Sequence, residues 1–233
     1  MTSNPKSDSR LSPPRKSRTV AFLMGLATGI LFMLCVPSYL SHVREEALQM
    51  GCASNMKNIL LALRTYHEQF GSFPPAYTVD AEEKKLQSWR VLILPQLGKE
   101  ELYRQIRLDE PWDSDHNKQF HSQMPDFYFC PAERSMRRHY KNSYKTSYVW
   151  MIGPGLISDG TSCMRMSDLS NNTPVLVETL AWDCWMSPED MTMERCWVSY
   201  TDWAHKGPFM GIRSNHRTVT TIGFADGFVM CIH

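Results

Sequence analysis

The chain has 233 residues, and its 25 Lys and Arg residues nearly balance its 24 Asp and Glu residues. This length suffices for one sizeable domain that buries a core without a metal or cofactor. Because the chain has no strong basic charge to hold phosphates, we expect no nucleic acid partner.

The first 19 residues are polar and rich in proline and serine. A segment without apolar periodicity cannot offset the entropy lost on ordering, so residues 1–19 are predicted to form a disordered tail. Four cations lie in the second half of this tail: Arg10, Arg15, Lys16 and Arg18.

An uncharged, mostly apolar run of 21 residues follows, from Val20 to Leu40. As a helix it would be about 31 Å long, which matches the hydrocarbon core of a bilayer. By the positive-inside rule, the preceding cations place the N-terminus in the cytoplasm. We therefore expect residues 20–40 to cross a bacterial inner membrane once, with residues 41–233 forming a periplasmic, extracytoplasmic domain. A cleaved signal peptide is the main alternative, but Val36-Pro37-Ser38-Tyr39 offers no small-x-small cleavage site.

From Leu40 to Phe70 the pattern becomes amphipathic, with apolar residues every three or four positions and charged residues between them. Gly71 can supply a left-handed C-cap, and Pro74-Pro75 prevents continuation. The sequence therefore predicts one long helix, Val20–Phe70, whose first half is a membrane anchor and whose second half packs on its own domain.

Runs of β-branched and aromatic residues then predict strands over 127–130, 146–152, 175–180, 218–225 and 228–232. Asp226-Gly227, between the last two, predicts a hairpin with a type I′ turn, which needs positive φ at both central residues. Helices first and antiparallel strands later favour an α+β fold, in which the long helix packs on an antiparallel β-sheet.

Several blocks of sequence carry a resemblance to a known family. They are CASNMKNILLALRTYHEQFGSFPPAYTVDAEEKKLQSWRVLILPQL, IRLDEPWDSDHNKQF, MPDFYFCP and SNHRTVTTIGFADGFV. They resemble the bacterial pilin-like proteins of domain-of-unknown-function family 1559, often labelled as prepilin-type or as similar to the major pseudopilin of type II secretion. The family's C-terminal signature is a His, nine residues and then Asp-Gly, which corresponds here to His216, Asp226 and Gly227.

The resemblance implies a pilin-like fold and a structural or interaction role in the cell envelope, through self-association or contacts with other envelope proteins. Family members typically begin with a prepilin signal, cleaved next to a segment that carries a Glu inside the membrane. Here no Glu occurs between Val20 and Val36. This departure favours a fixed membrane anchor over a processed filament subunit.

The sequence contains no nucleophile elbow, no His-Glu-x-x-His and no phosphate-binding glycine loop, so we expect no enzyme and no cofactor. An extracytoplasmic ligand- or metal-binding module is the alternative function. Its candidate ligands are the cluster His205, His216, Asp226 and His233, and the calcium-type oxygen ligands of the acidic run 109–115. We interpret Asp226-Gly227 as a turn and not as a metal site.

Six of the seven cysteines lie beyond the apolar run, in a compartment where disulfides persist. Their spacing alone does not choose among the many pairings. Cys52 and Cys130 stand in blocks shared with the family, one on the long helix and one on the predicted strand 127–130. If that strand packs on the helix, a bridge between the two would stabilise the domain by about 4 kcal/mol.

Overall fold

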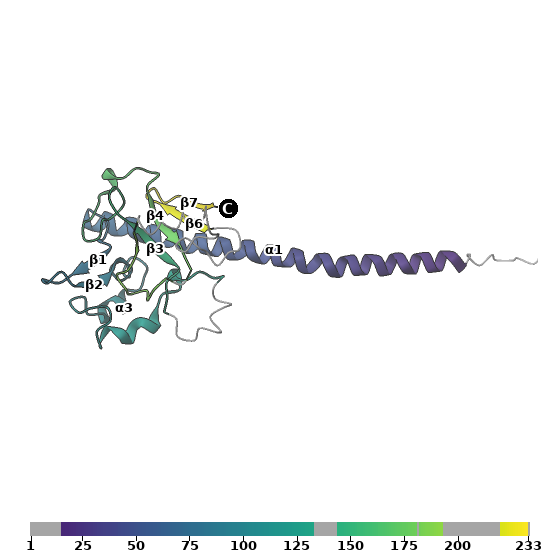
Figure 1. Ribbon diagram of the computed structural model, residues 1–233, viewed down its shortest axis with the longest axis horizontal. Helices are drawn as coiled ribbons and strands as arrows, with labels where there is room; N and C mark the ends of the chain where they lie inside the picture. Colours follow the sequence, from purple (N-terminus) through teal and green to yellow (C-terminus); the bar gives the residue numbers. More distant parts are fainter. Residues whose placement is uncertain (1–14, 133–143, 181, 193–219, 233) are drawn as a thin grey trace, which may run out of the picture. The chain divides into compact units, whose positions relative to one another are not determined.

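The computed structural model describes residues 15–132, 144–180, 182–192 and 220–232. The chain falls into two compact units, which divide between Arg44 and Glu45. One helix, α1 (Arg15–Phe70), contributes to both units, and the second unit holds the strands β1 to β7 (Figure 1). The fold is α+β, with a long N-terminal helix followed by a domain built on a mixed sheet.

The first unit contains the N-terminal half of α1, whose side chains are mostly apolar on all sides. The helix begins at Arg15, so residues 15–19, predicted as part of a disordered tail, are helical. Residues 1–14 lie outside the described residues. Large apolar side chains stay exposed along this half: Val20, Phe22, Leu23, Met24, Leu26, Ile30, Phe32, Met33, Leu34, Tyr39 and Leu40. Within the described residues, one helix is long and apolar enough to cross a membrane, and either an anchor or a signal sequence has this length and composition.

The second half of α1 buries one face between Cys52 and Leu63, as its amphipathic pattern predicts, whereas Leu40, Val43, Met50 and Phe70, at the ends of the same predicted stripe, are exposed. The buried side chains include Cys52, Met56, Ile59, Leu60 and Leu63. Lys57 and Arg64 are exposed on the opposite side. The helix ends where predicted, because Gly71 adopts a φ of +79° and its N–H donates to the His67 carbonyl at 2.8 Å.

A small hairpin and several short helices lie between α1 and the main sheet. They are β1 (Tyr77–Val79), β2 (Lys85–Ser88), α2 (Trp89–Leu92), α3 (Glu100–Gln105), and the 3-10 helices η1 (Asn117–Gln123) and η2 (Asp126–Tyr128). Strands β1 and β2 pair antiparallel. The Ser88 hydroxyl caps α2 by accepting from the Arg90 N–H at 3.2 Å.

The strand predicted over residues 127–130 is absent from the structure. Its first half is helix η2, which Pro125 precedes, and Pro131 follows the segment. Tyr128 is nevertheless fully buried, and its hydroxyl donates to the Arg90 carbonyl at 2.8 Å. The aromatic residues therefore signalled burial correctly, but a short apolar run does not by itself distinguish a strand from other buried backbone.

The main sheet has five strands in the order β5-β3-β4-β6-β7. Strands β3 (Tyr148–Ile152), β4 (Pro174–Glu178), β6 (Thr220–Phe224) and β7 (Val229–Ile232) form antiparallel pairs, as predicted. Strand β5 (Met191–Thr192) pairs parallel with β3, so the sheet is mixed and not wholly antiparallel. The 3-10 helix η4 (Met166–Asp168) lies on the connection between β3 and β4.

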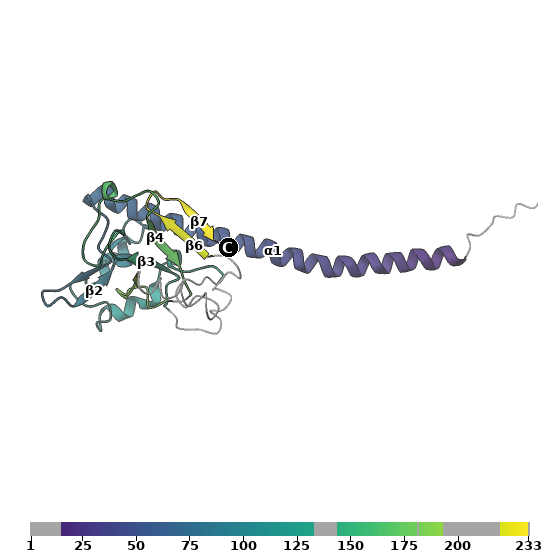
Figure 2. The ribbon, with the colours of Figure 1, turned by 45° about the horizontal axis from the view of Figure 1, so that its top comes forward.

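Strand β6 lies directly against the second half of α1 (Figure 1, Figure 2). A Cβ atom at Gly223 would stand 2.9 Å from the Leu60 Cδ1 atom and 3.0 Å from the Met56 sulfur. Glycine lets the strand lie this close to the helix, because a side chain here would have to displace the ends of the Leu60 and Met56 side chains. The same core contains the stacked rings of Trp89 and Trp150, whose centroids lie 4.8 Å apart.

Strands β6 and β7 form the predicted hairpin around Asp226 and Gly227, but the turn is of a different type. The Gly227 N–H donates to the Phe224 carbonyl at 3.0 Å, and the Phe224 N–H donates to the Phe228 carbonyl at 2.9 Å. Gly227 has a φ of +88°, whereas Asp226 has no positive φ. This is a three-residue loop that ends in a left-handed glycine, and not a type I′ turn. The Asp226 carboxylate fixes the loop by accepting from the Phe228 N–H at 2.8 Å.

Candidate functional site

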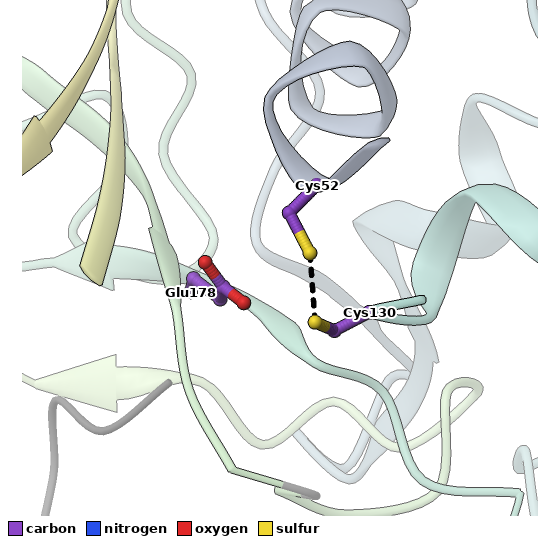
Figure 3. A group of neighbouring side chains, drawn as sticks. All are labelled: Cys52, Cys130 and Glu178. Carbon is purple, nitrogen blue, oxygen red and sulfur yellow. Dashed lines mark hydrogen bonds between the residues drawn. The ribbon is translucent and has the colours of Figure 1, made fainter. Parts of the chain in front are cut away.

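The described residues contain a buried cysteine pair, Cys52 and Cys130, beside Glu178 (Figure 3). The two Sγ atoms lie 2.7 Å apart. A carboxylate oxygen of Glu178 and the two sulfur atoms all lie within 4.8 Å of one another. All three residues have no exposed surface. Two thiols and a carboxylate therefore share one site that solvent does not reach.

Side-chain contacts of neighbouring residues hold the cysteine pair in place without involving its sulfur atoms. The Asn55 side-chain amide, one turn along α1 from Cys52, donates to the Phe129 carbonyl at 3.0 Å. The Pro131 ring packs on Gly51 so closely that a Cβ atom there would stand 3.1 Å from the Pro131 Cγ atom. The residues on both sides of Cys130 therefore contact α1, and these contacts fix the position of Cys130 against the helix.

Strand β3 and Ser147, the residue before it, also support the site. The Cys130 N–H donates to the Ser147 hydroxyl at 2.9 Å, and the Tyr148 hydroxyl donates to the Cys52 carbonyl at 3.3 Å. Glu178, at the end of β4, stands opposite Tyr148 in the register of the two strands. Burial raises the pKa of Tyr148 well above its ordinary value, and repulsion from Cys52 and Glu178 adds to this effect. The hydroxyl therefore remains a hydrogen-bond donor at neutral pH.

Two thiols at this separation support two kinds of chemistry. Oxidation would join them in a disulfide, whose S–S bond is about 2.05 Å long. Alternatively, two thiolates and a carboxylate are suitable ligands for Zn²⁺. With Zn–S bonds of about 2.3 Å, a tetrahedral ion would hold the sulfur atoms roughly 3.8 Å apart. The observed 2.7 Å lies closer to the disulfide than to the metal geometry.

A second buried polar cluster surrounds Arg90 and Asp190. An Arg90 Nη2 hydrogen is donated to the Asp190 carboxylate at 2.5 Å, and neither side chain is exposed. The same carboxylate accepts from the Trp89 indole N–H and from the Trp150 backbone N–H, each at 3.0 Å. Because its oxygen atoms are occupied by these donors, we assign the cluster to core structure and not to chemistry.

Comparison with known proteins identifies the family of the chain. A family model described as protein of unknown function DUF1559 (SBP_bac_10) matches residues 41–168. The chain belongs to the DUF1559 family. No curated protein and no solved structure matches the chain.

The DUF1559 match extends from the region around the boundary of the two units to helix η4. It therefore includes both members of the cysteine pair but ends before Glu178. The resemblance noted in the sequence blocks is confirmed for this part of the chain. The family description does not include a pilin-like fold.

The C-terminal signature and the other candidate ligands are only partly described. Asp226 and Gly227 occupy the hairpin turn, whereas His205, His216 and His233 lie outside the described residues. In the acidic run 109–115, the Glu110 carboxylate accepts from the Arg107 guanidinium at 2.7 Å and from the Ser114 hydroxyl at 2.8 Å. These contacts within one loop lower the pKa of Glu110.

Sequence reasoning named the two cysteines but missed Glu178 and Tyr148. A signal for Glu178 was present, because it is the one acid in the apolar run 175–180. Charged residues are rarely buried in a strand of this kind, and the structure shows Glu178 fully buried beside the cysteine pair. Tyr148 offered no such signal, since tyrosine is common in ordinary strands.

Proposed function

We propose that this chain is a non-enzymatic, membrane-anchored structural or interaction protein of the bacterial cell envelope, organised like a pseudopilin. The observation that carries the proposal is the dual character of α1. Its first half is apolar and exposed, and its second half is the helix on which strand β6 packs. One helix with both properties is suited to hold a folded domain at a membrane surface.

The exposed first half supports insertion into lipid. Phe22, Phe32 and Met33 are each between 70% and 78% exposed. Transfer of each such side chain into hydrocarbon is favourable by about 2 kcal/mol. The helix satisfies its own backbone hydrogen bonds, so the bilayer need not supply any. We therefore propose that residues 20–40 cross the inner membrane and that the lipid bilayer is the first partner of the chain.

The cations before this span set the proposed orientation, with the N-terminus in the cytoplasm and the domain outside it. A reporter enzyme that works only outside the cytoplasm should be active when fused after His233 and inactive when fused before Val20. The reverse pattern would overturn the orientation. Release of the domain from washed membranes as a shortened chain would show a cleaved signal peptide in place of an anchor.

The proposal of a fixed anchor concerns the N-terminus itself. The run Val20–Val36 contains no Glu, and the sequence around it does not match the prepilin processing signal. The protein purified from membranes should therefore have the mass of the full chain, apart from loss of Met1. A methylated new N-terminus near Val20 would instead make the chain a processed filament subunit.

The interaction role predicts specific neighbours in the envelope. Because the sequence lacks the common catalytic motifs, we propose that the domain binds other envelope proteins or copies of itself and turns over no substrate. Cross-linking in intact cells, followed by detergent extraction, should recover the chain in complexes of defined mass. Recovery as a monomer at every cross-linker concentration would count against this role.

A further inference from the structure

We infer that Cys52 and Cys130 are a disulfide modification site, oxidised while the domain folds and sealed from solvent afterwards. The inference rests on the proposed function, because only an exported domain meets a lasting oxidant. It goes further by naming the bond and the chemical class of the partner that forms it, a protein disulfide carrier of the envelope.

The fold brings the sulfur atoms together without help from the bond. Asn55 ties α1 to the carbonyl of Phe129, and Ser147 accepts from the N–H of Cys130. These contacts hold the pair in place from the helix and from the residue before strand β3. The sulfur atoms then need to approach by only roughly 0.7 Å from their 2.7 Å separation to reach bonding distance.

Burial decides when the bond can form. Thiol–disulfide exchange requires one sulfur atom to attack another directly, so the oxidant must reach the thiol. In the folded domain neither Cys52 nor Cys130 exposes any surface. The carrier must therefore act before the segment around Cys130 settles on α1. Once the segment has settled, the same burial protects the bond from reductants.

The oxidation is a two-step exchange whose electrons and atoms balance. The thiolate of one cysteine attacks the carrier disulfide, which forms a mixed disulfide and releases one carrier thiolate. The thiolate of the second cysteine then attacks the mixed disulfide and releases the other carrier thiolate. The chain loses two protons and two electrons, and the carrier disulfide gains them and becomes two thiols.

A substitution of Glu178 distinguishes a disulfide from a metal site. A disulfide needs only the two sulfur atoms, whereas a metal ion would need the carboxylate as a third ligand. Glu178→Gln keeps the size of the side chain and removes its charge. The bridge should survive this change, and a bound metal should be lost.

The test uses the full chain from cells quenched with acid, whose thiols are then alkylated in denaturant so that buried thiols also react. Non-reducing peptide mapping should find Cys52 linked to Cys130 in nearly all molecules, in the wild type and in Glu178→Gln alike. Cys52→Ser should leave Cys130 alkylated. The matched control Cys163→Ser removes an exposed cysteine and should leave the bridge unchanged.

Sealing is tested on the native, oxidised protein with a water-soluble phosphine. The bridge should persist until denaturant is added, while a mixed disulfide placed on the exposed Cys163 should be reduced at once. Loss of the bridge without denaturant would overturn the sealing.

Two further results would overturn the inference itself. Both thiols could be found alkylated in a domain that the topology reporter places outside the cytoplasm, in which case the proposed function stands and the inference alone fails. Stoichiometric zinc in the wild type that is absent from Glu178→Gln would make the site a metal site. A reporter result that places the domain in the cytoplasm would instead remove the proposed function.

Discussion

Arg90 and Asp190 form an ion pair of 2.5 Å inside the core, although 100 residues separate them in the sequence. Removal of one partner would leave a buried charge without compensation. We expect Arg90→Met to lower the free energy of unfolding by about 3 to 5 kcal/mol. Denaturant unfolding of the detergent-solubilised protein, followed by tryptophan fluorescence, measures this directly.

The same substitution at an exposed ion pair is the matched control. Arg104 and Glu100 also lie close, at 2.6 Å, but their side chains are 71% and 61% exposed. Arg104→Met should therefore change the free energy of unfolding by less than about 0.5 kcal/mol. An equal decrease in the free energy of unfolding in the two variants would show that burial does not increase the contribution of the Arg90 ion pair to stability.

The titration of Asp190 should make the free energy of unfolding depend on pH. Burial raises the pKa of Asp190 to about 6 from its ordinary value of 3.8, although Arg90 and the hydrogen bonds act in the opposite direction. The folded domain therefore holds a proton that the unfolded chain releases between these values. The resulting stabilisation is complete below pH 3.8 and is lost as the pH rises through about 6, on the order of 3 kcal/mol in total.

Asp190→Asn removes this titration while it keeps the shape of the side chain. The unfolding free energy of the wild type minus that of Asp190→Asn should decrease between about pH 4 and pH 7. A difference that increases over this range would show that attraction to Arg90 outweighs the cost of burial.

A side chain at Gly223 should weaken the contact between β6 and α1. Gly223→Val would place its Cβ atom 2.9 Å from Leu60 Cδ1, in a core where both helix neighbours are packed. We expect a loss of about 1 to 3 kcal/mol in the free energy of unfolding. Thr220→Val, at a half-exposed position of the same strand, should change it little. A similar loss in both variants would indicate a general effect of valine on the strand.

The hairpin turn should depend on the backbone of Gly227 and not on space around it. Its φ is +88°, and a Cβ atom there would meet nothing within 4 Å. Gly227→Val should therefore lower the melting temperature through backbone strain of about 1 to 3 kcal/mol. Gly227→Asn should cost less, because asparagine adopts positive φ more readily. Equal melting temperatures for the two variants would contradict this explanation.

The alternative reading of the same signature is a metal site that includes His216 and Asp226. Under the turn interpretation, chelators should leave the melting temperature unchanged, and His216→Ala should have a modest effect. If the signature binds a metal, chelation should lower the stability of the wild type to that of each alanine variant. A stoichiometric transition metal that survives dialysis and is lost in His216→Ala would decide for the metal.

The sequence predicted those parts of the fold that depend on local patterns. The middle of the amphipathic stripe predicted over Leu40–Phe70 is the buried face of α1, at Met56, Ile59 and Leu63, although the ends of the stripe are exposed, and Gly71 ends the helix as expected. The hairpin at Asp226-Gly227 was predicted, but its turn type was not, because Asp-Gly fits both two-residue and three-residue loops. Local residue types therefore fix the position of a turn better than its exact geometry.

Long-range partners could not be predicted in the same way. Arg90 and Asp190 are charged residues, which are usually exposed, and nothing in their spacing pairs them. The cysteine pair was predicted only through the family blocks, and Glu178 joins it from a strand outside the matched residues. Such contacts depend on how the helices and strands pack together, and local sequence patterns do not predict this packing.

The packing of β6 on α1 also has a consequence for the making of the protein. The ribosome makes α1 about 150 residues before β6, so the helix face with Met56 and Leu60 has no partner strand until those residues have been made. Contacts so distant along the chain slow folding, and an uncovered apolar face invites aggregation. A premature stop codon shortly before Gly223 would therefore yield no shortened working domain, but a helix with a bare apolar face for quality-control proteases to remove.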